Sequence, residues 1–98
     1  MIYHITTKQN WLQALQDGNY TSPSLFTEGF IHNCTETQVD AVLQRYYAGQ
    51  NDLVKLHINE TKLTAELKYE LAPSVNEEFP HIFGPINIDA VELAEELG

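Results

Sequence analysis

The sequence predicts one α+β domain, residues 1–98, with two helices and a largely antiparallel sheet. The chain has 43% hydrophobic residues, enough for one modest core without a disulfide or a structural metal. Helical spacing of apolar residues occurs in the first half, and short alternating segments follow one another in the second half. Consecutive strands with short connections favour an antiparallel sheet over a doubly wound parallel one.

The first predicted element is a strand at residues 2–5, because this segment is short, β-branched and aromatic. Alternation places Ile2 and His4 on one face of the strand and Tyr3 and Ile5 on the other. Both faces therefore carry an apolar side chain.

A helix is predicted next, with Thr6 or Thr7 as its N-cap and Asp17 near its end. Gly18 supplies the left-handed residue that stops it, and residues 19–23 form a polar turn. The side chains expected to form the buried stripe of this helix are Trp11, Leu12 and Leu15.

A second strand and helix are predicted to follow. A short strand centred on Ile31 would place Phe30 and His32 on one face. Thr35 and Gln38 have the spacing of a capping box, which marks the start of a helix. The helical stripe is Val39, Val42, Leu43 and Tyr46, and Gly49 closes the element.

The second half is predicted to contain three further strands, at residues 52–58, 66–70 and 86–91. The inward residues of the first of these are Val54, Leu56 and Ile58. Residues 59–62 are expected to form a turn, and residues 73–78 a loop. Residues 79–85 are too rich in Pro and Gly for a regular element. The acidic tail is expected to be a solvated end that contains Glu92, Glu95 and Glu96.

Charge and cysteine content narrow the classes of function. The formal net charge of −9 argues against nucleic acid and anionic membranes as partners. The N-terminus lacks the pattern of a signal peptide, and no apolar run approaches the roughly 20 residues of a membrane span. Cys34 is the only cysteine, so no intramolecular disulfide forms, and we expect a cytoplasmic protein.

Two segments that combine aromatic residues, glycine and histidine, residues 24–35 and 79–85, are predicted to be the two walls of one pocket. Imidazole donates or accepts hydrogen bonds near neutral pH, and aromatic, Gly and Pro residues shape cavities. Glu28 and His32 are the candidates for catalysis. The full set of predicted pocket residues is His4, Ser24, Glu28, Gly29, Phe30, His32, Phe79, His81, Phe83 and Gly84.

Each candidate also has a purely structural interpretation. The four histidines lack the spacing of a zinc motif, so no metal site is predicted, and they serve equally well as hydrogen-bonded core residues. Cys34 would share a strand face with His32, but nothing marks the third group that orients such a pair. A small buried hydrophobe is the preferred interpretation of Cys34. His57, beside Lys55, is expected on the surface.

Several segments form a recognisable combination: Ile2-Tyr3-His4-Ile5-Thr6, Trp11, Ser24-Leu25, Glu28-Gly29-Phe30-Ile31-His32, Asp52-Leu53 and Phe79-Pro80-His81-Ile82-Phe83-Gly84-Pro85-Ile86. With them the chain resembles the bacterial family called domain of unknown function 952, and the resemblance covers nearly the whole chain. It implies an ADP-ribosyltransferase-like fold, in which a split sheet borders a cleft that binds NAD.

In ADP-ribosyltransferases an early-strand histidine binds the ribose, and an aromatic ring stacks on nicotinamide. A late-strand glutamate stabilises the oxocarbenium-like transition state. The resemblance gives His4 the first role, and the candidates for the second are Phe30, Phe79 and Phe83. The late strand, residues 86–89, contains no glutamate, and the acids that would replace it are Glu28, Glu77 and Glu78.

The predicted function is therefore a pocket for a nucleotide or another small molecule, with NAD as the candidate substrate of transferase or glycohydrolase chemistry. The alternative is a non-catalytic interaction module whose acidic surface meets a basic protein. The related RNA 2′-phosphotransferases need basic residues for phosphates, and five Lys and Arg residues in an acidic chain argue against RNA. The sequence makes no prediction of the oligomeric state.

Overall fold

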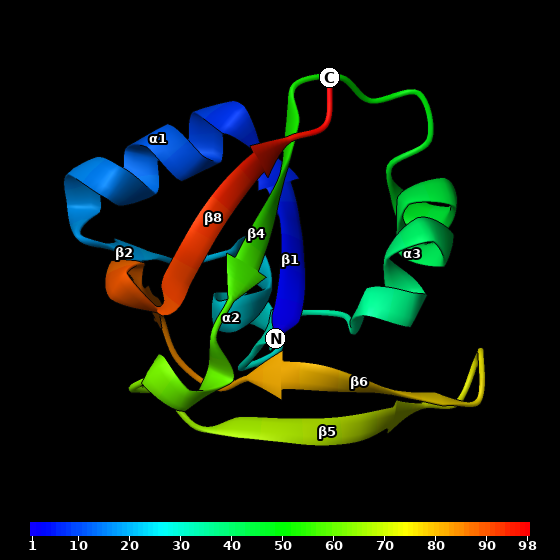
Figure 1. Cartoon of the computed structure of the whole chain (residues 1–98). Coiled ribbons are helices and arrows are strands. Elements are labelled where there is room, and N and C mark those ends of the chain that lie inside the picture. Colours follow the sequence, from blue (N-terminus) through cyan, green and yellow to red (C-terminus); the bar gives the residue numbers. More distant parts are fainter.

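The computed structural model describes all 98 residues, and its elements alternate between strands and helices in the first half before strands dominate (Figure 1). The strands are β1 (Ile2–Thr7), β2 (Asn19–Tyr20), β3 (Ile31–His32), β4 (Leu53–Ile58), β5 (Leu67–Ala72), β6 (Glu77–Ile82), β7 (Ile86–Asn87) and β8 (Val91–Glu96). The α-helices are α1 (Lys8–Asp17), α2 (Pro23–Thr27) and α3 (Val39–Tyr46). Short 3₁₀ turns lie at residues 36–38, 60–62 and 88–90.

The strands form three separate antiparallel sheets, with orders β1-β4-β8, β3-β6-β5 and β2-β7. The prediction of an α+β domain with largely antiparallel pairing is confirmed. In Figure 1 the β5–β6 hairpin runs across the end of the first sheet at which β1 begins. Tyr3 and Cys34 join these two sheets, because each backbone N–H donates to the other residue's carbonyl at 2.8 Å.

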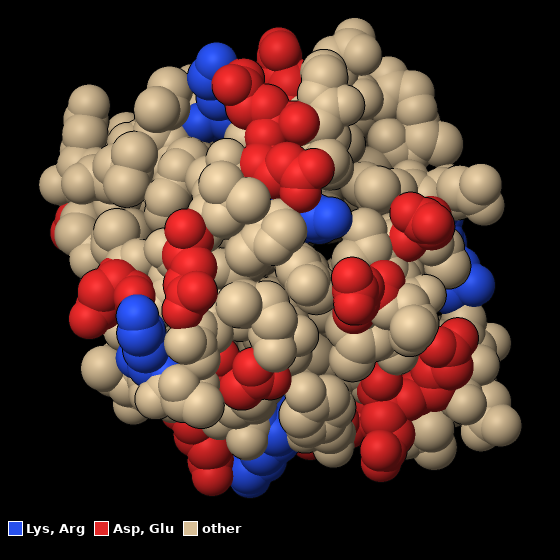
Figure 2. Space-filling view, in the orientation of Figure 1, with Lys and Arg blue, Asp and Glu red and all other residues tan.

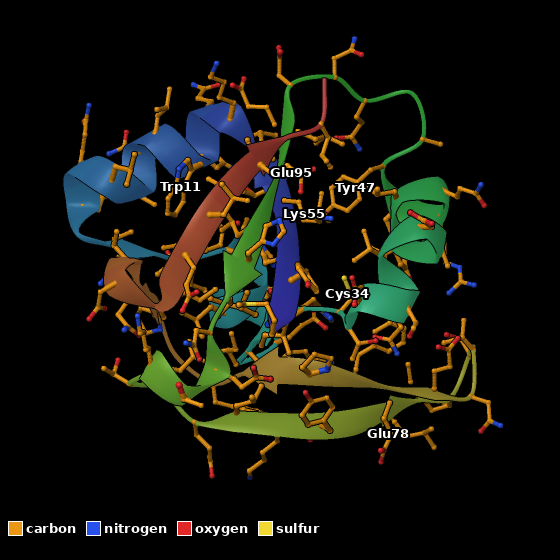
Figure 3. The ribbon with its side chains drawn as sticks, viewed as in Figure 1. Trp11, Cys34, Tyr47, Lys55, Glu78 and Glu95 are labelled. Carbon is orange, nitrogen blue, oxygen red and sulfur yellow. The ribbon has the colours of Figure 1, made fainter.

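The β1-β4-β8 sheet separates two hydrophobic cores. Ile2, Leu56 and Ile58 face the larger core, which includes Ala14 of α1. The smaller core contains Tyr3, Ile5, Cys34, Val39 and Leu53. Figure 3 shows Trp11 between the sheet and α1 on one side, and Tyr47 and Cys34 toward α3 on the other. The predicted alternation of β1 and the predicted inward face of β4 are both confirmed.

Helix α1 begins and ends where the sequence predicts. The Thr7 hydroxyl accepts the Asn10 N–H at 3.1 Å, and Gly18 adopts φ = 86°, a left-handed conformation that glycine tolerates best. The predicted buried stripe is wrong in part. Leu12 and Leu15 are about half exposed, because the face turned to the sheet is centred on Ala14 and the partly buried Trp11.

The capping box at Thr35 and Gln38 is confirmed, although it opens a 3₁₀ turn that leads into α3. Val39 is buried as predicted, whereas Tyr46 is 61% exposed. Helix α2 is absent from the prediction, in which residues 19–23 are a turn. It begins with Pro23, a residue suited to the first helical position because it lacks an N–H.

The prediction that residues 79–85 form no regular element is wrong, because β6 includes Phe79 to Ile82 and is the central strand of its sheet. Pro80 is tolerated there because it lies opposite Asn33, where β3 has already ended. Its carbonyl still accepts the Asn33 N–H at 3.1 Å. Because the N and the carbonyl of a strand residue point to the same neighbour, the missing N–H costs one bond to Asn33 and none to β5.

The acidic tail is a strand rather than a free end, although Glu92 and Glu96 are exposed as predicted. Its residues form β8, which pairs with β4, and Glu95 accepts hydrogen bonds or ion pairs from His57 at 2.9 Å and Lys55 at 3.4 Å. His57 is consequently half-buried rather than a free surface residue. Figure 2 shows acidic residues dispersed over the visible face, several of them beside basic residues. None of the helices is long and apolar enough to cross a membrane.

Candidate functional site

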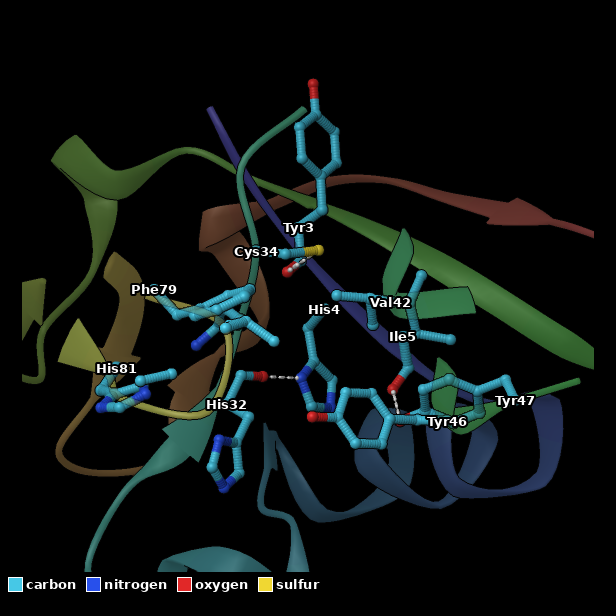
Figure 4. Close-up of a pocket in the computed structure, with 13 residues that line it drawn as sticks. Tyr3, His4, Ile5, His32, Cys34, Val42, Tyr46, Tyr47, Phe79 and His81 are labelled. Carbon is cyan, nitrogen blue, oxygen red and sulfur yellow. Dashed lines mark hydrogen bonds between the residues drawn. The ribbon is translucent and has the colours of Figure 1, made fainter. Parts of the chain in front are cut away.

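A pocket of about 470 Å³ lies among β1, α3 and the β5–β6 hairpin (Figure 4). Most of its wall is apolar. The residues that line it are Tyr3, His4, Ile5, His32, Asn33, Cys34, Val42, Tyr46, Tyr47, Ala72, Val75, Phe79 and His81. Its volume is within the range of about 300–1,000 Å³ that small-molecule sites occupy.

The pocket is an unfilled part of the smaller core. Tyr3, Ile5 and Cys34 belong to that core and also line the pocket. Gln38, just before α3, holds the start of this helix against β6, because its side-chain amide donates to the Glu78 carbonyl at 2.8 Å. Farther along α3, the helix and the hairpin leave a space between them, where the exposed Tyr46 ring also lines the wall.

His4 is the polar centre of the pocket floor, and its ring is fully hydrogen-bonded. Its Nδ1 lies 2.5 Å from the His32 carbonyl (Figure 4). Its Nε2 lies 2.8 Å from the Tyr20 hydroxyl. A carbonyl only accepts, so a neutral ring carries its proton on Nδ1 and accepts the Tyr20 hydroxyl on Nε2. The Thr6 hydroxyl lies 2.9 Å from that of Tyr20 and extends the chain of hydrogen bonds.

Burial lowers the pKa of His4 to about 4, against a smaller opposing effect of the bond to the His32 carbonyl. His4 is therefore neutral at pH 7. With both ring nitrogens engaged by the protein, His4 holds β1 against residue 32 and has no free nitrogen to offer to a ligand.

His32 and His81 form a cross-strand pair between β3 and β6, with ring centroids 5.3 Å apart. Each imidazole contacts one carboxylate. His32 Nε2 lies 3.2 Å from Glu28, in an exposed pair, and His81 Nδ1 lies 2.7 Å from Glu70. Carboxylates only accept, so the Glu70 bond places the proton of a neutral His81 on Nδ1.

The Phe30 ring packs directly on His81, with centroids 4.0 Å apart and the ring planes 14° from parallel. Phe83 lies 5.6 Å from Phe30, and Lys68 is positioned over the Phe83 ring. One face of His81 is thereby covered, and the ring is held between Phe30 and the carboxylate of Glu70. This packing orients His81 more firmly than His32, whose side chain is about half exposed.

Cys34 is a small buried residue. It is 2% exposed, its thiol donates to the Tyr3 carbonyl at 3.6 Å, and burial raises its pKa to about 11. A thiol of this kind is almost entirely protonated at neutral pH, so it is a poor nucleophile. Asn33 is also buried, and its Nδ2 donates to the Ile31 carbonyl, whereas its shielded Oδ1 has no partner in the protein.

The structure brings only part of the predicted site together. The predicted residues that line the pocket are His4, His32, Phe79 and His81. Those that contact these histidines from outside the pocket include Glu28 and Phe30. Ser24 instead donates to the Phe30 carbonyl at 2.7 Å, Gly29 provides a turn at φ = 90°, and Gly84 packs against Ala65.

Several lining residues are absent from the predicted site. Val42 and Tyr46 are four positions apart and therefore share one face of α3, a spacing that by itself indicates a buried stripe. Ala72 ends β5, Val75 lies in the hairpin turn, and neither carries a functional signature. Only the fold brings them opposite α3.

The lining contains no Asp, Glu, Lys or Arg, so its titratable side chains are His, Tyr and Cys. No three His, Cys, Asp or Glu side chains meet in an arrangement that holds a metal ion. The pocket therefore offers a large apolar surface with a few polar atoms and no carboxylate, ammonium or guanidinium group.

Three solved structures of protein CC0527 from Caulobacter crescentus are similar to this chain. Its crystal structure is 28% identical, superposes with a TM-score of 0.90, and is matched over 99% of this chain and 85% of that one. A solution NMR structure of CC0527 is also 28% identical and superposes with a TM-score of 0.84, over 98% of this chain and 83% of that one. A crystal structure of a double mutant of CC0527 has 26% identity and a TM-score of 0.89, over 99% of this chain and 85% of that one.

Among curated proteins, none matches this chain. A family model described as "Protein of unknown function (DUF952)" matches residues 5–94, which contain half of β1 and most of β8. The extent of that match confirms the predicted family, and the chain belongs to DUF952.

Proposed function

We propose that the protein binds a small, uncharged molecule with an aromatic or other flat apolar ring. The observation that carries this proposal is the pocket of about 470 Å³, which opens within a hydrophobic core and has no Asp, Glu, Lys or Arg in its lining. Burial of apolar ligand surface there would supply the main favourable term. Phe79 and the tyrosines Tyr46 and Tyr47 offer the aromatic contacts.

NAD, implied by the resemblance to ADP-ribosyltransferases, is a weaker candidate for this pocket. Its pyrophosphate is anionic, and no Lys or Arg lines the pocket of a chain whose net charge is −9. Glycosidic cleavage further needs a carboxylate beside the ribose, whereas Glu28 reaches only His32 and Glu77 and Glu78 are exposed. These contacts favour a neutral ligand and a binding function.

The acidic interaction module is supported less well than the pocket. Four of the five basic residues already form ion pairs with glutamates on the protein itself. The visible face in Figure 2 shows dispersed acids and no single acidic patch. No surface on that face therefore identifies a basic partner.

The test is titration with toluene, indole and ADP-ribose, followed by amide chemical shifts of the protein. We expect toluene and indole to shift residues around the pocket, and ADP-ribose to cause no shift there. Val42→Trp fills the pocket and should abolish these shifts, whereas Ala41→Trp, on the exposed neighbouring position of α3, should preserve them. Absence of pocket shifts with both apolar probes, or equal binding by Val42→Trp, would refute the proposal.

A further inference from the structure

We infer that His81 is the recognition group of the pocket, and that its Nε2 accepts a hydrogen bond from a hydroxyl on the ring of the ligand. This inference rests on the proposed function and adds the chemical class of the ligand, a neutral phenol-like molecule. It depends on the geometry around one imidazole.

Glu70 determines which nitrogen of a neutral His81 carries the proton. Glu70 Oε1 lies 2.7 Å from Nδ1, and a carboxylate has only acceptor sites. In the neutral ring the proton is therefore on Nδ1, and Nε2 presents a lone pair. The carboxylate also strengthens Nε2 as an acceptor, as it does for imidazoles that are held by a carboxylate at other sites.

The Nε2 atom of His81 is free to meet a ligand. The side chain of His81 is 11% exposed, and no group of the protein makes a hydrogen bond to this nitrogen. Phe30 covers a face of the ring, so only an edge can meet a ligand. Because His81 lines the pocket, that edge offers a polar atom to a bound ligand.

Several other polar groups of the pocket already form hydrogen bonds within the protein. His4 uses both nitrogens within the protein, and the Tyr47 hydroxyl donates to the Ile5 carbonyl at 3.1 Å. The Cys34 thiol donates to the Tyr3 carbonyl. His81 is a buried lining group that is firmly oriented and keeps one nitrogen unpartnered, and a ligand that donates an O–H satisfies it. Asn33 Oδ1 also lacks a partner but is shielded, and the side chains of His32 and Tyr46 are exposed.

Phenol and anisole provide the test, because methylation removes the donor and keeps the ring. We expect the wild-type protein to bind phenol roughly five- to tenfold more tightly than anisole, the value of one hydrogen bond. In His81→Phe the preference should fall to about one while anisole still binds. Glu70→Gln should reduce the preference, and Glu66→Gln, the same change at the start of the hairpin, should leave it intact.

The nitrogen chemical shifts of His81 give an independent readout. Wild-type protein should show a protonated Nδ1 and an unprotonated Nε2, and phenol should shift Nε2 most. A proton on Nε2 in the wild type, or equal affinities for phenol and anisole, overturns the recognition role while leaving the pocket itself supported. Failure of phenol, anisole and toluene alike to bind overturns both proposals.

Discussion

The imidazole of His4 and the hydroxyl of Tyr20 are joined by a hydrogen bond of 2.8 Å inside the protein, where both residues are less than 10% exposed. This bond connects β1 to β2, and the other ring nitrogen connects β1 to residue 32. The folded protein therefore requires a neutral imidazole at this position.

We predict that His4 destabilises the folded state as the pH falls. The pKa of His4 is about 4 in the folded protein and 6.5 ordinarily. Between these two values the unfolded chain therefore binds a proton at His4 that the folded chain does not bind. The contribution of His4 to the free energy of unfolding is constant above pH 6.5. It falls progressively between pH 6.5 and 4, by about 3 kcal/mol in total. Urea unfolding at several pH values measures it.

His4→Phe is the matched comparison, because it keeps a planar ring of similar size and removes the titration. This variant is expected to be less stable at pH 7, since the His32 carbonyl and the Tyr20 hydroxyl lose their partner. Its free energy of unfolding should nevertheless change less steeply between pH 6.5 and 4. Identical slopes for the two proteins would show that His4 does not control the acid response.

A second prediction concerns Tyr20→Phe. Removal of the hydroxyl leaves His4 Nε2 and the Thr6 hydroxyl without their buried partner, so we expect a loss of about 1–3 kcal/mol. Tyr69→Phe is the control, because Tyr69 is about half exposed and should change stability by less than about 0.5 kcal/mol. Equal unfolding midpoints for the two variants would contradict the role assigned to the buried chain.

Local signals account for the parts of the fold that the sequence predicts well. The N-cap at Thr7, the stop at Gly18 and the Thr35–Gln38 box each require residues only a few positions apart. Such motifs specify where a helix begins or ends without reference to the rest of the chain. Strand alternation in β1 is similarly local, which explains why its two faces are predicted correctly.

The errors arise where distant partners decide the outcome. Pro80 enters a strand because β3 ends opposite it, and the acidic tail becomes β8 because β4 offers an edge and His57 pairs with Glu95. The candidate site shows the same division. The aromatic and glycine neighbours of the two strand histidines mark them as pocket residues, whereas Val42 lines the pocket only because α3 faces the hairpin.

The third prediction is slow alkylation of Cys34. A thiol with a pKa of about 11 rather than 9.0 has roughly 100-fold less thiolate at pH 8, and burial further restricts access. The reaction with iodoacetamide should therefore be at least about 100-fold slower than that of Ser74→Cys in a Cys34→Ala background, where the new thiol is exposed. Comparable rates at pH 8 would mean that Cys34 is accessible and activated, and would restore it as a candidate nucleophile.

The fourth prediction tests the close approach of Gly84 to Ala65. A Cβ added at Gly84 would lie 2.8 Å from the Ala65 Cβ, which is too close for two carbon atoms. Gly84→Ala should therefore lower the free energy of unfolding by about 1–3 kcal/mol, as overpacking does. Ala65→Gly removes the clashing atom, so the double variant should recover part of that loss, measured as a coupling energy in a double-mutant cycle. Additive effects would show that the two residues do not determine each other's packing, and that the segment after β6 adjusts without strain.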